Sequence, residues 1–372
     1  LEQDKILQDL AQVREEIKKY EQILADEVLL LNVIMGELEE IRRRYGNPRR
    51  TEIVDESKEL QIEDLIAEED MVVTISHDGY IKRNPISLYQ SQRRGGRGIT
   101  GMTVKEEDFV VNLFIASTHH MLLFFTERGR VYWLKVHQIP QAGRASKGKA
   151  IVNMLNLSQD EKIVACLPVR EFEEGKFIAT CTRKGIVKKT ALTEYSSLRS
   201  MGIIGLKVEE DDALISAALT DGGRDLVLST KNGMSIRFNE TGVRATGRAT
   251  YGVRGISMDS GDEVVSMEVI SDGITLLTVT ENGYGKRTRT EEYRRQNRGG
   301  HGLITIRTSS RYPRCKNGNV VGVRQVTDED ELMLITNTGR IIRMPVKGIS
   351  VIGRNTQGVK LFSLHPDEKV SG

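Results

Sequence analysis

The stretch LVLSTKNGMSIRF, residues 226–238, decides the fold. An apolar run leads into Asn232-Gly233, and a second run with strand-forming residues follows it. Asn-Gly between two such runs is a strong local signal for a β-hairpin. It favours a type I′ turn, in which both central residues have positive φ. This stretch therefore predicts two antiparallel strands joined by a tight turn.

Five other stretches repeat this pattern along the chain. The six turn glycines are Gly79, Gly129, Gly185, Gly233, Gly283 and Gly339. Each is followed, 19 residues later or 17 in the third unit, by a second glycine: Gly98, Gly148, Gly202, Gly252, Gly302 and Gly358. Periods of about 50 residues with several strands in each are typical of blades around an axis. We expect a closed, six-bladed, all-β propeller-like ring.

The start of the chain has a different, helical period. Apolar residues recur every three or four positions from Ile6 to Leu24 and from Leu31 to Ile41, with Asp26 as a candidate N-cap between the two runs. Residues 47–68 are polar and acidic. We expect a helical segment at 1–46, a linker at 47–68 and the ring at 69–372. The absence of an initiator Met indicates part of a longer protein.

Composition narrows the class of function. The net charge of +2 conceals an acidic start, because residues 1–70 hold 20 acidic and 10 basic side chains, whereas residues 71–372 hold 32 and 44. A basic body favours a polyanionic partner. No apolar run is long enough to span a membrane. Three scattered cysteines indicate a reducing cytoplasm, and no metal site is expected.

Basic residues recur at fixed positions of the repeat. Cations shortly after the turn glycines are Lys82, Arg83, Lys135, Lys188, Lys189, Arg237, Lys286, Arg287 and Arg343. Cations shortly before the second glycines are Arg94, Arg144, Lys147, Arg199, Arg248, Arg298 and Arg354. Equivalent positions in successive blades share one height and radius, so these residues predict a belt of charge. The alternative is that they only solubilise exposed strands and protect their edges.

A belt of charge suits a bent polymer better than a small ligand. Bending a short duplex by 40–90° costs roughly 1–6 kcal/mol, and a fuller wrap costs more. About a dozen phosphate contacts, two in each blade, would offset this through counterion release. Few aromatic residues lie among the cations, which favours duplex DNA over stacked single strands.

The segment that ends at Gly98, the second glycine of the first unit, carries a resemblance to a known family. Its residues Gln92, Arg93, Arg94, Gly95, Gly96, Arg97 and Gly98 form QRRGGRG. This stretch resembles the A-box of the DNA gyrase A family, whose pattern is Q-R-R-G-G-[KR]-G. Further similar stretches are YGNPRRTEI (45–53), EEDMVVTISHDGYIKR (68–83), NGYGKRT (282–288) and IGRNTQGV (352–359).

The resemblance implies a C-terminal DNA-wrapping domain, a six-bladed β-pinwheel that follows the end of a helical arm of the breakage–reunion core. Such a domain bends duplex DNA around its rim so that the ATP-driven holoenzyme introduces negative supercoils, and the A-box is required for the wrapping. The partners implied are duplex DNA, the core of the same polypeptide, and gyrase B in an A2B2 tetramer, in the bacterial cytoplasm on the chromosome. ATP and Mg²⁺ belong to gyrase B and the core. This segment is expected to carry neither cofactor nor catalytic residues.

Two alternatives stay open at this point. One is the similar domain of topoisomerase IV, whose box is degenerate or missing. The other is a propeller that serves as a scaffold for proteins. The pattern GRGITG at 96–101 also fits a dinucleotide-binding motif, but MTVKEEDFVV follows it and offers no amphipathic helix to a pyrophosphate.

The fifth unit contains a second, imperfect copy of the box. QNRGGHG, residues 296–302, matches QRRGGRG at five of seven positions. We expect a weaker DNA contact there, with Arg298 as a cation. Because His301 replaces Arg97, this contact is predicted to depend on pH near neutrality.

Overall fold

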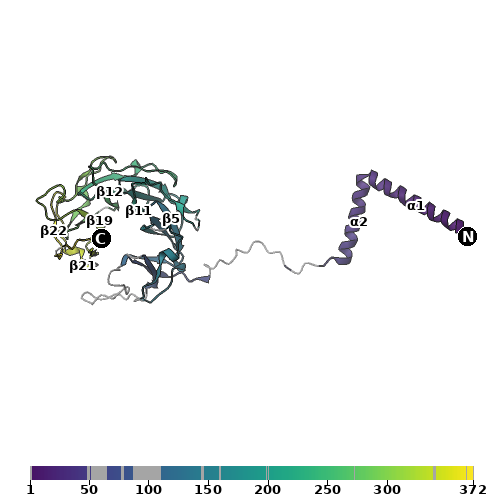
Figure 1. Cartoon of the computed structure of the whole chain (residues 1–372), viewed down its shortest axis with the longest axis horizontal. Coiled ribbons are helices and arrows are strands. Elements are labelled where there is room, and N and C mark those ends of the chain that lie inside the picture. The colour runs from purple at the N-terminus through teal and green to yellow at the C-terminus, as the bar shows by residue number, and fades with distance from the viewer. Residues whose placement is uncertain are drawn as a thin grey trace. The chain divides into compact units, whose positions relative to one another are not determined.

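The computed structural model of the chain describes residues 2–47, 51, 65–76, 79–86, 110–143, 146–158, 161–197, 199, 201–271, 273–337, 341–365 and 367–371. The chain divides into two compact units, Leu1–Leu60 and Gln61–Gly372. The first unit contains helices and the second contains strands (Figure 1).

Two helices form the first unit, α1 (Glu2–Ala25) and α2 (Glu27–Tyr45), and they contact each other. Asp26 is the N-cap of α2, as the sequence predicts: its carboxylate accepts a hydrogen bond from the Val28 amide at 2.9 Å. This bond satisfies one of the amides that the first turn of a helix leaves without a partner. Three arginines in the last turn of α2 complement its negative end.

Six hairpins organise the second unit. They are β1 (Asp70–Ser76) with β2 (Tyr80–Pro85), β4 (Met121–Thr126) with β5 (Arg130–Lys135), β8 (Phe177–Thr182) with β9 (Ile186–Ala191), β12 (Asp225–Thr230) with β13 (Met234–Asn239), β16 (Thr275–Thr280) with β17 (Tyr284–Arg289), and β20 (Glu331–Ile335) with β21 (Ile341–Pro345). Their positions confirm the six hairpins expected from the repeat.

The hairpin turns differ from the expected type I′. In the fourth hairpin the Gly233 amide donates to the Thr230 carbonyl, and the Met234 amide donates to the Thr230 hydroxyl at 3.2 Å. Gly233 has a φ of 86°, but the described residues include no non-glycine residue with positive φ other than Asp367. The turn is therefore a type I turn followed by a left-handed glycine, and the prediction of positive φ at Asn232 is wrong. The threonine hydroxyl supports a geometry that needs one left-handed residue instead of two.

Each of the first five hairpins receives two strands from the next repeat. A long strand joins one side: β3 (Val110–Ser117), β7 (Ile163–Val169), β11 (Leu214–Thr220), β15 (Val264–Ile270) or β19 (Val320–Val326). A two-residue strand joins the other side: β6 (Lys149–Ala150), β10 (Ile203–Ile204), β14 (Val253–Arg254), β18 (Leu303–Ile304) or β22 (Val359–Lys360). This exchange links every blade to its successor.

Apolar cores lie between consecutive blades. Strand β12 is buried on both faces, with Leu228 packed in the cluster toward β8 and Val227 in the cluster toward β16. A strand covered on both faces reads as a continuous apolar run, because successive side chains point to opposite sides. The described residues form five such clusters, which join the six hairpins in order.

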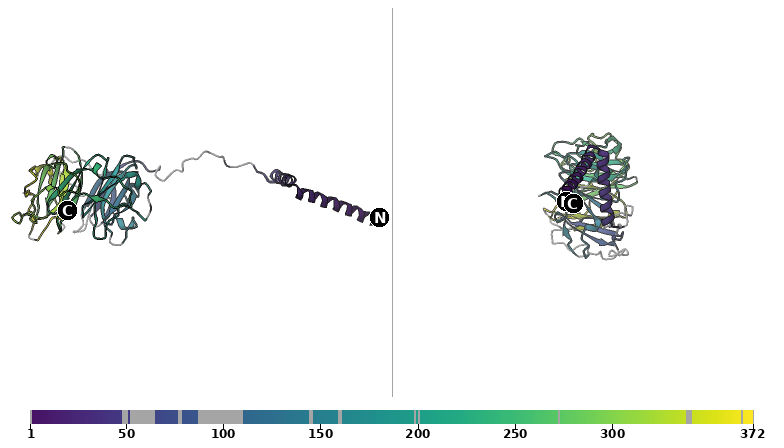
Figure 2. Two further views of the ribbon diagram at one scale, coloured as in Figure 1. Left: turned by 90° about the horizontal axis from the view of Figure 1, so that it is seen from above. Right: turned by 90° about the vertical axis from the view of Figure 1, so that its right-hand side faces the viewer.

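The sheets follow one another around a centre in chain order (Figures 1 and 2). Strands β7, β11, β15 and β19 contact one another from blade to blade, so they form the inner edge of the arrangement. The two-residue strands lie at the opposite edge of each sheet. The architecture is an all-β, propeller-like ring, and the two-residue strands mark its outer rim.

The expectation of six equal blades needs correction. The described residues form five four-stranded sheets, whereas β20 and β21 form a two-stranded sheet. The physical reason lies in the exchange, because a blade is completed by strands from the repeat that follows it. Val370, near the chain end, bridges Thr336 beside β20, as Val264 pairs with Thr230 in the fourth blade. The chain end therefore adds to the sixth hairpin.

Candidate nucleic-acid interface

Seven-residue segments end in the second glycines, and those that the structure describes lie at the outer rim. We call these segments, residues 92–98, 142–148, 196–202, 246–252, 296–302 and 352–358, the box turns of units one to six. Each described box turn leads directly into a two-residue outer strand. That strand pairs with the second strand of the preceding hairpin, for example Leu303 with Ser235. The fold therefore presents outward the box turns that the structure describes.

The second glycines allow the box turns to lie flat on the preceding hairpin. A Cβ atom at Gly148 or Gly252 would lie 2.5 Å from the carbonyl oxygen of Ile81 or Val187. At Gly302, whose φ is 75°, a Cβ atom would lie 2.4 Å from the Ser235 carbonyl oxygen. Close approach of backbone to backbone thus explains why this glycine recurs.

The arginines of the box turns connect neighbouring turns along the rim. The Arg298 guanidinium donates to the Arg254 carbonyl at 3.2 Å and to the Gly242 carbonyl at 2.8 Å. Arg248 donates to the Ile204 carbonyl at 3.5 Å, and Arg354 donates to the Ile304 carbonyl at 3.0 Å. In each case an acceptor belongs to the outer strand of the preceding box segment. Arg298 is exposed, and Arg248 and Arg354 are partly exposed.

The structure describes every residue of the fifth box turn. The Gly299 amide donates to the Gly255 carbonyl at 2.7 Å, and the Ser257 amide donates to the Gly300 carbonyl at 2.9 Å. Gly299 has a φ of 81°, which only glycine adopts without strain. The His301 side chain is exposed and lines a depression shared with Asp259, Asp262 and Arg311. The A-box itself, Gln92 to Gly98, and Arg144 lie outside the described residues.

The predicted rim contacts on the strands are mostly buried instead. The side chains of Lys82 and Lys286 are 0% exposed, that of Lys188 is 2% exposed, and Lys189 and Arg287 are also buried. A phosphate has little or no access to cations buried this deeply, so the prediction that these five residues contact DNA directly is corrected. Each of them donates to at least one main-chain carbonyl of the next repeat, and Lys189 and Arg287 also pair with carboxylates there. These partners satisfy charges that burial would otherwise leave unpaired.

Burial also changes the ionisation of these lysines. Removal from water lowers the pKa of Lys82. Burial, with Arg248 nearby, lowers the pKa of Lys188 to about 8. Burial lowers the pKa of Lys286 to about 7, although the Glu292 carboxylate works against this change. Uncompensated burial favours the neutral form of an amine, so Lys188 and Lys286 lie near their titration range at neutral pH.

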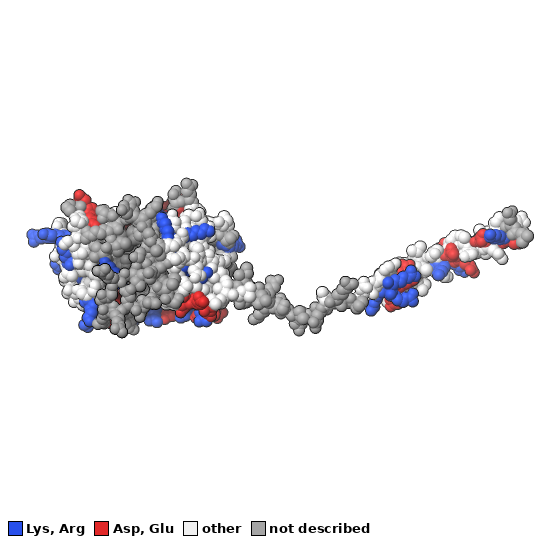
Figure 3. Space-filling model, turned by 90° about the horizontal axis from the view of Figure 1, so that it is seen from below, with Lys and Arg blue, Asp and Glu red and all other residues white. Residues whose placement is uncertain are grey.

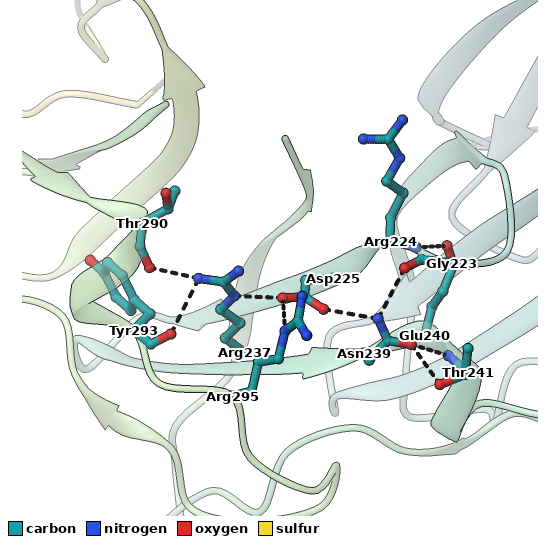
Figure 4. A network of polar contacts seen from close by, with 10 residues as sticks. All are labelled: Gly223, Arg224, Asp225, Arg237, Asn239, Glu240, Thr241, Thr290, Tyr293 and Arg295. Atoms are coloured by element: carbon teal, nitrogen blue, oxygen red, sulfur yellow. Dashed lines mark hydrogen bonds and ion pairs between the residues drawn. The ribbon is translucent and has the colours of Figure 1, made fainter. Parts of the chain in front are cut away.

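The other strand cations also join blades. Arg83 donates to the Ile139 carbonyl at 2.7 Å. Arg237 donates to the Asp225 carboxylate at 2.7 Å and to the Thr290 carbonyl in the next repeat at 2.8 Å. Figure 4 shows that Arg295, from the next repeat, reaches the same carboxylate, at 2.6 Å. Burial works to raise the pKa of Asp225, but hydrogen bonds from Arg295, Asn239 and Arg237 hold it below its usual value.

The remaining predicted cations are at least partly accessible. Arg199 and Arg343 are exposed, and Arg343 pairs with Glu331 on the neighbouring strand. Lys135 is partly exposed. The Lys147 ammonium lies 3.9 Å from the centre of the Tyr80 ring, where the face of the ring attracts a cation. Figure 3 shows Lys and Arg side chains distributed around the edge of the ring unit in one view, rather than gathered at one point.

Sequence reasoning missed two groups at the rim. Arg254, two residues after the second glycine of the fourth unit, is exposed on β14. Arg130, one residue after the turn glycine of the second unit, donates to the Met201 carbonyl in the third box turn at 2.6 Å. Neither position is basic in most of the other units, so a search for recurring cations passes over both.

The described residues contain no group of three or more His, Cys, Asp or Glu side chains that could hold a metal ion. Neither described helix is long and apolar enough to cross a membrane. The accessible side chains of the described rim include arginine and lysine groups, which are suited to anionic oxygen atoms.

Comparisons with known proteins agree on one family. A family model described as the DNA gyrase C-terminal domain, a β-propeller, matches residues 70–117, 120–170, 176–221, 224–271, 275–312 and 330–372. The DNA gyrase A protein of Clostridium acetobutylicum is 51% identical over 370 residues, which cover 100% of this chain and 44% of that protein. The DNA gyrase A protein of Salmonella typhimurium is 46% identical over 343 residues, 92% of this chain and 38% of that protein. The chain thus spans less than half the length of these curated relatives.

Two solved structures share the fold. The C-terminal domain of a DNA topoisomerase IV aligns with a TM-score of 0.70 and 27% identity, over 82% of this chain and 93% of that one. A DNA gyrase A C-terminal domain aligns with a TM-score of 0.65 and 24% identity, over 82% of this chain and 98% of that one.

Proposed function

Because the chain belongs to the DNA gyrase C-terminal domain family, we propose that its ring binds duplex DNA along the outer rim and bends it. The bound segment is wrapped so that a type II topoisomerase holoenzyme passes DNA in one direction and introduces negative supercoils. Catalysis, ATP and Mg²⁺ are assigned to other parts of that enzyme, and the ring contributes the bend. The proposed setting is an A2B2 assembly of gyrase A with gyrase B in the bacterial cytoplasm, on the chromosome.

The observation that carries this proposal is the outward placement of the box turns. Arg248, Arg298 and Arg354 lie at equivalent rim positions, and each is held by a carbonyl of the preceding box segment. An arginine already fixed in position loses less side-chain freedom when it meets a phosphate, because its planar group is preorganised. A curved row of such groups favours the bent form of a polyanion.

Charge neutralisation along the rim provides the energy for bending. Wrapping a duplex shorter than its persistence length of about 150 bp costs several kcal/mol. Each neutralised phosphate releases counterions, which makes binding steeply dependent on salt. Such contacts read the DNA backbone and carry little sequence information, as a general wrapping device requires.

We further propose that the ring closes with six blades. Six segments of the chain match the family model, and the sixth hairpin has the same register as the others. In a closed ring the A-box occupies the first box position. In this proposal the arginines around the glycine pair of the A-box hold the phosphate backbone. The A-box also favours gyrase over the topoisomerase IV alternative that the fold likeness leaves open.

The fifth box turn supports a second, weaker contact in the same proposal. Arg298 and His301 are both exposed there. Replacing both residues should weaken duplex binding, which is measured at pH 6 and at pH 8. Equal binding by the variant and the original chain at both pH values would remove this contact from the proposal.

A salt titration tests the proposed function. The dissociation constant for a duplex of about 150 bp is measured by gel shift at several salt concentrations. The proposal predicts that the logarithm of the association constant, the inverse of the dissociation constant, decreases steeply with log salt, by about 0.9 for each phosphate contact. Weak binding that does not respond to salt would instead favour the scaffold for proteins.

A further inference from the structure

The six repeats alternate at one strand position. The third residue after the turn glycine is Lys82, Lys188 or Lys286 in units one, three and five, and Tyr132, Ile236 or Ile342 in units two, four and six. The box turn that follows each lysine in the next unit contains the pattern Gly-Arg-x-Ser/Thr-x-Gly. These turns contain GRASKG (143–148), GRATYG (247–252) and GRNTQG (353–358).

Each lysine hydrogen-bonds to the box turn of the next repeat. The Lys82 ammonium donates to the carbonyls of Gly143 and Ser146, at 3.3 and 2.9 Å. The Lys286 ammonium donates to the Gly353 carbonyl at 2.6 Å and to the Arg354 carbonyl.

The Lys188 ammonium makes the same link in the third unit. It donates to the Arg248 carbonyl and, at 3.2 Å, to that of Gly205, which follows the outer strand β10. For Lys188 and Lys286 the bonded turn residue is therefore itself the arginine of the rim.

Box turns three and five rest on uncharged side chains. A Cβ atom at Gly202 would lie 2.7 Å from the Tyr132 ring, and one at Gly300 would lie 3.6 Å from the Ile236 side chain. The ring therefore contains two kinds of box turn. Turns two, four and six have a cation beneath them, whereas turns three and five lie on a ring or an aliphatic chain.

We propose that Lys188 and Lys286 are positioning residues for DNA wrapping: each holds the box turn of the next repeat in the shape that directs its arginine, Arg248 or Arg354, to the phosphate backbone. This inference rests on the proposed function. The lysines do not touch the DNA. Their ammonium groups donate hydrogen bonds to main-chain carbonyls of the turn. These bonds fix the backbone of the turn beneath the arginine.

Protonation is part of this role, since a neutral amine is a weaker donor than an ammonium group. Arg248, Glu194 and the Tyr195 hydroxyl surround Lys188, and Glu292 and Arg354 act on Lys286. DNA phosphates at the rim favour the charged lysine. Affinity is therefore expected to fall as pH rises through about 7 to 8, where Lys286 and Lys188 lose their protons in the free protein.

Folding stability has the opposite dependence on pH. The folded pKa of these lysines is lower than the value of about 10.4 in an unfolded chain, so the unfolded state binds more protons between these limits. Stability contributed by these groups therefore rises with pH from about 7 toward 10 while affinity falls. Loss of binding at high pH is thus distinguishable from unfolding.

The test uses the full chain with Lys188→Met and Lys286→Met, and Lys184→Met as the matched control. Methionine has a similar length and no charge, and Lys184 lies on the same hairpin as Lys188 but pairs with the exposed Asp211. Duplex affinity is measured from about pH 7 to 9, above the range in which histidine titrates. Unfolding by urea is followed in parallel.

We expect each of the two variants to bind about tenfold more weakly at pH 7 and to lose the part of the decline with pH that its own lysine causes, while the control retains the whole decline. Wild-type binding with a steep salt slope, combined with unchanged affinity and pH profile in both variants, would overturn the positioning role alone. Salt-insensitive binding by the wild type would instead overturn the proposed function. If a variant fails to fold, the pH profile of the wild-type chain decides, because a flat profile contradicts the role.

Discussion

The strand lysines and the box-turn arginines occupy neighbouring positions in every other blade, yet their surroundings are opposite. Lys286 is 0% exposed and donates to carbonyls, whereas Arg354, the residue whose carbonyl it contacts, extends to the accessible rim. One cation stabilises the turn from beneath and the other is available from outside. The inner cation thus supports the fold, whereas the outer cation is accessible at the rim of the same blade.

The difference has a structural cause. The lysines lie on β2, β9 and β17, whose outer edge is covered by the box segment of the next repeat. The arginines belong to that covering segment, so no further strand of the described sheets lies outside them. Removing an outer cation should therefore change binding, and removing an inner one should change folding or the shape of the turn.

The largest effect is expected at the first box turn. Replacing Gln92 to Gly98 by alanine should abolish wrapping but leave much of the affinity, because the other blades keep their cations. Wrapping is measured by the linking-number change that the chain traps in relaxed circular DNA on closure by ligase. Persistence of that change in the variant would contradict the special role of the A-box.

The next effect concerns the rim arginines described by the structure. Changing Arg248, Arg298 and Arg354 together to glutamine should weaken duplex binding by about tenfold for each lost charge-assisted contact. The slope of log K against log salt should decrease by about 2.7 in the same experiment. The midpoint of urea unfolding serves as the control and should change little. A large loss of stability with an unchanged slope would show that these arginines are structural.

Replacing an inner cation should instead lower the free energy of unfolding. The Lys189 ammonium donates to the Glu240 carbonyl at 2.9 Å and lies 3.9 Å from its carboxylate, which is 0% exposed. Lys189→Met leaves that buried carboxylate without its counter-charge, which should cost about 3 kcal/mol in the free energy of unfolding. Lys184→Met, at an exposed pair, should leave the free energy of unfolding nearly unchanged. Equal unfolding midpoints for the two variants would contradict the distinction between inner and outer cations.

A smaller effect separates close approach from backbone conformation. Gly302 and Gly261 both have positive φ, but a Cβ atom meets the Ser235 carbonyl at Gly302 and nothing within 4 Å at Gly261. Gly261→Ala should cost about 1 kcal/mol through its φ alone. Gly302→Ala adds the clash, for a total of about 3 kcal/mol. Chemical denaturation of both variants measures the difference, and equal losses would mean that the fifth box turn moves away without cost.

The hairpins could be predicted because their signals are local. Apolar runs around Gly233 specify strands whatever surrounds them, and Asp26 caps α2 through its own neighbours. The predicted turn type was wrong because the Thr230 hydroxyl accepts a hydrogen bond from the amide of Met234, the residue after the glycine. The completeness of the sixth blade could not be predicted either, since the strands that complete a blade come from the next repeat.

The repeat period alone could not predict how deeply each cation is buried. A repeat fixes the angle at which a residue stands in the ring, but burial depends on which segment covers it. Lys188 and Arg248 therefore received the same assignment as rim contacts, although the first is 2% exposed. The alternation of lysine with tyrosine or isoleucine was the available signal, because residues that replace one another at one position share one environment.

Residue-resolved arginine modification tests the account most directly. The chain is treated with an arginine-selective dicarbonyl reagent, alone and with a duplex of about 150 bp, and the modified sites are identified by mass spectrometry. We predict that DNA protects Arg254, Arg298 and Arg354 at the rim and leaves Arg170, which follows the inner strand β7, as reactive as before. Protection of Arg170 with unchanged reactivity at the rim arginines would contradict wrapping around the outer edge.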